Sequence, residues 1–178
     1  MITVNKKTVL VLLFTVLLQL SGFSQQKEKA KEGFTWDKVV IGGNFGASFG
    51  QYTFVNVSPN VGYYFAKNLI IGVGGTYIYY DEPFYGSSNM FGGRVFSNYF
   101  LFEHFVLHAE YEVLNMEVYD FYGFSERKNI GSLLVGGGLR SALGGRSFAS
   151  IMLLYNLNES VYSPYSNPLL RVGFGIGL

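Results

Sequence analysis

The chain has 178 residues, a length typical of one folded domain, and its 13 basic and 12 acidic side chains leave a formal net charge of +1. This near-neutral balance gives no electrostatic basis for binding nucleic acid. The absence of cysteine excludes disulfides, thiolate metal sites and a lipid-modified cysteine after a leader. Charged residues make up only 14% of the chain and aromatic residues 18%, whereas ordinary soluble domains are roughly 25% charged.

The first residues have the pattern of a secretory signal peptide. Lys6 and Lys7 precede an apolar run from Val9 to Leu20, and small residues before Gln25 offer a peptidase site after Ser24. An uncleaved helical anchor is the alternative, but a spanning helix needs about 20 apolar residues and this run is shorter. We therefore predict a signal peptide over residues 1–24. The charged and polar residues 25–37 then form a periplasmic tether.

From Lys38 onward, apolar residues alternate with period two and turn residues separate the alternating stretches, which predicts strands. The predicted strands are Lys38–Phe49, Thr53–Phe65, Leu69–Tyr80, Met90–Phe100, Phe105–Met116, Ile130–Arg140, Ser147–Leu157 and Leu169–Leu178. The longest predicted loops are 81–89, 117–129 and 158–168. The pattern predicts an all-β, eight-stranded antiparallel up-and-down barrel over residues 38–178, with the last strand paired to the first. Pro59 lacks an N–H and predicts a bulge or a locally broken ladder.

The distribution of charge between the two faces of these strands indicates what surrounds the barrel. One face of all eight predicted strands carries no Asp, Glu, Lys or Arg, while the charges within strand bodies take the opposite face: Arg94, Glu110, Glu112, Arg140 and Arg171. A soluble lipocalin-like barrel needs the reverse arrangement, with charges outside and an apolar cavity inside. The pattern therefore favours a transmembrane barrel with an apolar outer wall and a polar lumen.

Arg94, Glu110 and Glu112 form the main candidate constellation. In an antiparallel hairpin, the residue numbers of each facing pair have the same sum. For a turn at residues 102–104 this sum is about 204–206, which places Arg94 opposite Glu110 or Glu112. Since eight strands enclose only enough room for side chains, we predict a lumenal ion-pair cluster that plugs the barrel. A gated conduit or a carboxylate site is the alternative. Glycines in the strands are expected to leave space for large neighbours such as Arg94.

His108 takes the same inward parity and lies near the two carboxylates, an arrangement that in principle suits acid–base chemistry. No positioned nucleophile accompanies it, because the outward Ser97 lacks an outward histidine partner. With two histidines and no ligand spacing, metal binding is also not indicated. We predict no catalytic, cofactor or metal site.

Aromatic residues mark the strand ends and the loops. Those at strand ends are typical of interfacial girdles. Further rings lie in the predicted outer loops: Phe84, Tyr85, Tyr119, Phe121, Tyr122, Tyr162 and Tyr165. They either contact lipopolysaccharide headgroups or a partner, or pack on each other over the barrel mouth. The sequence leaves this choice open.

The leader, the Tyr64–Leu69 turn, the strand with Arg94 and the closing residues 171–178 resemble small eight-stranded outer-membrane β-barrel proteins of the OmpX and OmpA-barrel type. In that family the final strand is the assembly signal, which falls here on Phe174, Ile176 and Leu178. It commonly ends in an aromatic residue, whereas this chain has Leu178.

The resemblance implies a location in the outer membrane of a Gram-negative bacterium. The partners it implies are outer-membrane lipids, lipopolysaccharide and the barrel assembly machinery. We expect a monomer with a plugged lumen and a structural or surface-interaction role. The alternative is a narrow channel for small solutes. Enzymatic barrels of this size that trim lipid A use a serine–histidine pair on the lipid-facing wall, and no such pair appears here.

Overall fold

The computed structural model describes residues 33–48, 53–82, 86–119, 125–158, 160, 162–165 and 167–178. The predicted signal peptide and residues 25–32 of the predicted tether lie outside the described residues. Within the part of the chain that is described, no helix is long and apolar enough to cross a membrane.

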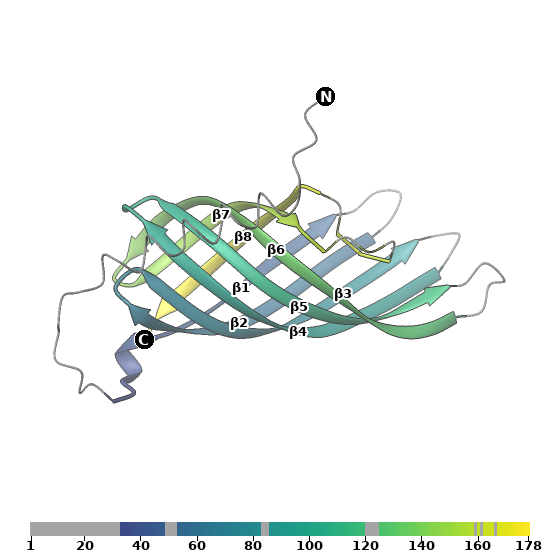
Figure 1. The fold of residues 1–178 in the computed structure, drawn as a ribbon, viewed down its shortest axis with the longest axis horizontal. Coiled ribbons are helices and arrows are strands. Elements are labelled where there is room, and N and C mark those ends of the chain that lie inside the picture. The colour runs from purple at the N-terminus through teal and green to yellow at the C-terminus, as the bar shows by residue number, and fades with distance from the viewer. Residues whose placement is uncertain are drawn as a thin grey trace, which may run out of the picture. The chain divides into compact units, whose positions relative to one another are not determined.

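The predicted fold class is confirmed: the strands form a closed antiparallel barrel in the order β1 to β8 (Figure 1). A short 3-10 helix, η1 (Trp36–Lys38), precedes the first strand. The strands are β1 (Val39–Ser48), β2 (Thr53–Ala66), β3 (Leu69–Glu82), β4 (Gly86–Leu101), β5 (Phe105–Tyr119), β6 (Ser125–Gly144), β7 (Ser147–Asn156) and β8 (Leu169–Gly177). Figure 1 shows η1 and the C-terminus at the same end of the barrel.

Buried and exposed residues alternate along the strands in step with the inward and outward positions predicted from the sequence. In β8, Arg171 and Gly173 are buried in the lumen, while Val172, Phe174 and Ile176 are exposed on the outer wall. Within the described strands, charged residues occupy outward positions only where a strand extends beyond its predicted bounds: Asp81, Glu117 and Arg127. The outer wall therefore has a charge-free belt below a charged rim.

Several strands are longer than predicted at the rim, so the predicted loops 81–89 and 117–129 are wrong in extent. The β3–β4 ladder continues to Glu82↔Gly86, and the β5–β6 ladder continues to Tyr119↔Ser125. Polar cross-strand contacts maintain these extensions: the Nε of Arg127 donates to the Asn115 side chain at 2.7 Å. The strand extensions lack the apolar alternation from which strands were predicted. Backbone hydrogen bonds and polar cross-strand contacts are enough to form a ladder where one face meets water.

Pro59 interrupts one of its two ladders, as the sequence predicted. On the β1 side it keeps its register position opposite Gly43. On the β3 side the paired residues stop at Val57↔Tyr77 and resume at Asn60↔Gly74 without a change of register. The ladder is broken here and no bulge forms, because proline has no N–H to donate.

Closure of the barrel uses a short ladder. Pairing between β1 and β8 runs from Val40↔Gly177 to Asn44↔Gly173, although both strands continue toward the outer rim. The β7–β8 ladder is longer, from Phe148↔Gly175 to Leu154↔Leu169. The predicted pairing of the last strand with the first is confirmed.

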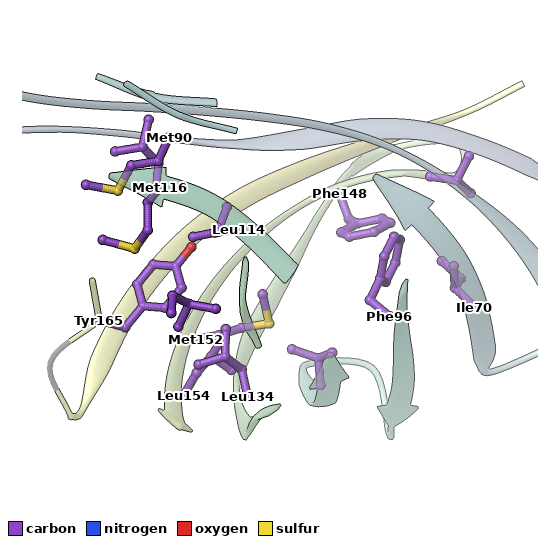
Figure 2. Close-up of a cluster of buried hydrophobic side chains, with 14 of the residues drawn as sticks. Ile70, Met90, Phe96, Leu114, Met116, Leu134, Phe148, Met152, Leu154 and Tyr165 are labelled. Carbon is purple, nitrogen blue, oxygen red and sulfur yellow. The ribbon is translucent and has the colours of Figure 1, made fainter. Parts of the chain in front are cut away.

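The lumen is filled by side chains in layers. Figure 2 shows Ile70, Phe96 and Phe148 grouped toward one end, and Met90, Met116 and Leu114 with Tyr165 toward the other. All of them are buried, as are Arg94, His108, Glu110, Glu112 and Arg171, whereas the inward Asn44, Asn98 and Arg140 are partly exposed. Two apolar layers thus enclose a polar one, and water is largely excluded from it.

Inward-facing Gly74 leaves the space in which Arg94 lies. A Cβ at Gly74 would approach the Pro59 carbonyl oxygen to 2.7 Å and the Arg94 Nε to 3.0 Å. Its neighbour Gly75 faces outward, where a Cβ would meet nothing closer than 3.9 Å. The two glycines are therefore a matched pair of sites, one crowded and one open.

We expect Gly74→Ala to lower the free energy of unfolding by about 1–3 kcal/mol, because the added methyl group overpacks the lumen. Gly75→Ala is the control and should change it by less than about 0.5 kcal/mol, as is usual for surface positions. Urea titration of the refolded proteins measures both. Equal effects of the two substitutions would contradict the packing assignment.

Candidate functional site in the barrel lumen

Glu110 of β5 is the centre of a buried ion-pair cluster. Its two carboxylate oxygens accept hydrogen bonds from Arg171 Nη1 of β8 at 2.6 and 2.7 Å. Arg94 Nη1 of β4 lies 3.2 Å from the Glu110 carboxylate. All three side chains are buried. Because unpaired charge is costly in such a place, the carboxylate between two guanidinium groups holds three strands in one arrangement.

Arg94 is further positioned by β1 and β2. Its Nη2 donates to the Ser58 carbonyl beside the Pro59 interruption, at 3.1 Å. With the Asn44 amide oriented to satisfy both groups, its oxygen accepts from both Arg94 Nη atoms, at 2.8 and 2.9 Å. Among the described residues, none accepts a hydrogen bond from the Arg94 Nε. Arg94 thus connects β4 to the first two strands and to Glu110.

Glu112 has different partners from those that the register alone suggests. It pairs in register with Arg94, within the range that the turn position predicts. Its side chain instead accepts hydrogen bonds from the Thr76 hydroxyl and the Tyr165 phenol, each at 2.5 Å. Glu112 is fully buried. The structure therefore divides the predicted cluster into an ionic part around Glu110 and a hydroxyl-lined part around Glu112.

Tyr165 is a lumenal residue that sequence reasoning assigned to an outer loop. It comes from the 157–168 connection between β7 and β8, and its ring is buried among Leu114, Met90 and Met116 (Figure 2). Asn156 and Asn167 fix this connection: the Asn156 N–H donates to the Asn167 side chain at 2.7 Å, and the Asn167 amide donates back at 3.1 Å. The asparagines at the two ends of this connection were the sequence feature that could have indicated an ordered loop.

Among the other predicted loop aromatics, the structure describes the side chain of Tyr162, which does not enter the lumen. Tyr162 is 41% exposed and lies under the Lys128 ammonium, 5.7 Å from the ring centroid. Phe84, Tyr85, Phe121 and Tyr122 lie outside the described residues, and the side chain of Tyr119 is not described.

His108 is buried beside the Glu110 end of the network. Its Nε2 lies 3.3 Å from the Glu110 carboxylate and its Nδ1 lies 2.6 Å from the Asn98 side-chain oxygen. The Phe96 ring stacks on the imidazole, with centroids 6.2 Å apart. Both ring nitrogens thus have protein partners, so the geometry suits a structural histidine better than a base facing a substrate.

Arg140 lies toward the end of the lumen that carries the β4–β5 turn, where its N–H donates to the His104 carbonyl at 2.7 Å. Its guanidinium lies 4.2 Å from the centroid of Phe100 and 4.7 Å from that of Phe148, two rings that pack edge to face. Such a cation between two rings is stabilised by their negative faces. Arg140 and the two rings close this end of the lumen.

The predicted assembly residues lie on the outer wall of β8 and just beyond it. Phe174, Ile176 and Leu178 are each more than half exposed. The Leu178 N–H donates to the Val39 carbonyl at 3.0 Å, so the last residue still contacts β1.

Side chains fill most of the lumen around this network. A cavity of about 30 Å³ remains between Arg94, His108 and Glu110, room for only one or two water molecules. Within the described residues, no group of three or more His, Cys, Asp or Glu side chains is arranged to hold a metal ion.

We expect Glu110→Gln to lower the free energy of unfolding by about 3–5 kcal/mol, because two buried guanidinium groups lose their counter-charge. Glu126→Gln is the matched control, since the Glu126–Lys128 pair on the rim is exposed and such pairs contribute about 0–1 kcal/mol. Urea unfolding of the refolded proteins measures the difference. Similar losses in the two variants would show that Glu110 is not the centre of the network.

Tyr165→Phe should cost about 1–3 kcal/mol at neutral pH, because buried Glu112 loses a hydrogen-bond donor. Burial, followed by the nearby Glu112 carboxylate, raises the pKa of the Tyr165 phenol well above its ordinary value of 10.0. The phenol therefore contributes stability that is complete below pH 10 and is lost as the pH rises toward its folded-state pKa. The stability difference between wild type and Tyr165→Phe should be constant from pH 7 to 9 and shrink above pH 10. Tyr162→Phe, at an exposed ring, should show neither effect.

No protein-family model matches the chain. The search of curated proteins also found no match. Among solved structures, the chain is similar to the N-terminal β-barrel domain of Pseudomonas aeruginosa OprF, with 11% identity, 78% of this chain and 94% of that chain covered, and a TM-score of 0.45. It is also similar to the Yersinia pestis outer membrane protein Ail, with 14% identity, 77% and 95% covered, and a TM-score of 0.44. The closed strand order defines the fold: the chain is an eight-stranded up-and-down β-barrel with an apolar outer wall, the architecture that its sequence resembles.

Proposed function

We propose that the chain is an integral outer-membrane β-barrel protein with a plugged lumen and a structural or surface-interaction role. The charge-free belt on the outer wall is the observation that carries this proposal. Residues such as Val73, Val95 and Leu153 are more than half exposed there. An outer wall of this kind is unfavourable in water and suits the hydrocarbon region of a bilayer.

The filled lumen supports a plug in preference to a conduit. Ions crossing the barrel would have to displace Arg94, Glu110 and Arg171 from mutual contacts of 2.6–3.2 Å. Tyr165 and the apolar residues around it block the outer side of this network. Breaking buried pairs of this kind costs several kcal/mol, so a static conducting path is disfavoured.

The outer rim offers a surface for partners. Arg127 and Lys128 bring cations to this end, and Tyr162 brings an exposed ring. Cations and aromatic rings next to an apolar belt suit the phosphate groups of lipopolysaccharide. We propose lipopolysaccharide and outer-membrane lipids as the physiological surroundings. The barrel assembly machinery is proposed to insert the chain as a monomer.

Two measurements test this proposal. The protein should fractionate with outer membranes and migrate differently on gels before and after heating, as folded membrane barrels do. In planar bilayers it should give no steady single-channel events. Glu110→Gln serves as the comparison, because loosening the plug should increase leakage. Recovery in the soluble periplasm would contradict the membrane assignment, whereas steady conductance by the wild type would favour the narrow channel.

A further inference from the structure

Residues 34–38 form an aromatic arm that folds back on the outer wall of the barrel, where the sequence predicted a plain tether. The Phe34 ring stacks on Tyr63 of β2, with centroids 5.4 Å apart and planes at 19°, and meets Trp36 edge to face at 5.2 Å. The Thr35 N–H approaches the Tyr63 hydroxyl at 3.4 Å. Val39 has outward parity but is buried beside this arm.

An exposed ion pair lies on the other side of the arm. Asp37 of η1 lies 3.5 Å from Arg146, in the turn between β6 and β7. Aromatic contacts to β2 and an ion pair to the β6–β7 turn thus hold the arm at two separate points. Trp36 nevertheless remains 71% exposed and Phe34 67% exposed. Two large rings fixed in exposed positions indicate a surface made for an apolar neighbour.

A groove of about 410 Å³ runs between the arm and the wall. Phe34 and Trp36 form one side, and the outward side chains of β2, β3 and β4 form the other: Val61, Ile71, Val73 and Val95. This volume is in the roughly 300–1,000 Å³ range of small-molecule sites. The lining contains no charged side chain. The groove therefore selects an apolar occupant.

We propose that this groove binds one acyl chain of a phospholipid from the periplasm-facing leaflet, an inference that rests on the proposed membrane location. The groove is continuous with the charge-free belt and opens at the end of the barrel that carries η1 and the C-terminus. Lys67, exposed in the β2–β3 turn at this end of the barrel, is the cation proposed to pair with the phosphate. The arm holds this lipid longer than the wall holds its other neighbours.

The single tryptophan of the chain, Trp36, makes the proposal testable by fluorescence. The protein is refolded into phosphatidylcholine vesicles that contain increasing fractions of phosphatidylcholine brominated in one acyl chain. The matched control is Phe105→Trp in a Trp36→Phe background, since Phe105 is an outward, half-exposed residue at the same end of the barrel, on β5. Because brominated and ordinary phosphatidylcholine compete equally for the groove, quenching of wild-type Trp36 by one bound chain should rise in proportion to the brominated fraction. Trp at position 105, which meets several lipid neighbours, should reach half-maximal quenching at a lower fraction.

A substitution that fills the groove provides a second test. Val61→Phe should shift the quenching curve of Trp36 to that of the control, whereas Val113→Phe, on the outward face of β5, should leave it unchanged. Identical curves for wild-type Trp36 and the control would overturn the bound lipid. An unquenched Trp36 beside a quenched control would overturn it too, and would point to a second copy or another segment of the chain in the groove. Loss of quenching at both positions would overturn the membrane location itself.

Discussion

The ion pair between Glu110 and Arg171 is the interaction on which the closed barrel depends, because it joins the last strand to β5 across the lumen. Arg94 adds a second connection, from β4 to Asn44 of β1. Both closing strands are therefore held from inside at the seam where their own ladder ends at Asn44↔Gly173. The β1–β8 ladder has few backbone hydrogen bonds because it stops early. Side-chain contacts in the lumen compensate for this short ladder at the seam.

The apolar layers make the network strong. Phe96, Phe148 and Ile70 exclude water on one side, and Leu114, Met116 and Tyr165 exclude it on the other. In a lumen filled this tightly, charged hydrogen bonds are stronger and unpaired charges more costly than in water, so the loss of one partner weakens the whole arrangement. The same condition separates a plug from a pore, since a conducting path would require water where these side chains now meet.

The outside of the barrel follows a different rule from the inside. Side chains on the wall form an uncharged, apolar belt that ends at Asp81, Glu117 and Arg127. Below that belt the aromatic arm adds a surface with a definite shape, and Val39 shows the effect by being buried despite its outward parity. The wall as a whole is uncharged and apolar, whereas the groove beside Trp36 also has a defined shape, on which the proposed binding of one acyl chain rests.

The sequence by itself determined the strand count, the order of the strands and the face on which each residue lies, because alternation with period two is a local property of an extended chain. It also placed Arg94, Glu110, Glu112, Arg140 and Arg171 on the inner face. Only the tertiary structure decided their partners. The strand register places Glu112 opposite Arg94, but the Arg94 side chain reaches Glu110 instead. Glu112 accepts hydrogen bonds from Thr76 and Tyr165. Tyr165 and the aromatic arm escaped prediction because they lie in non-repeating segments, whose positions depend on contacts with residues far away in the chain.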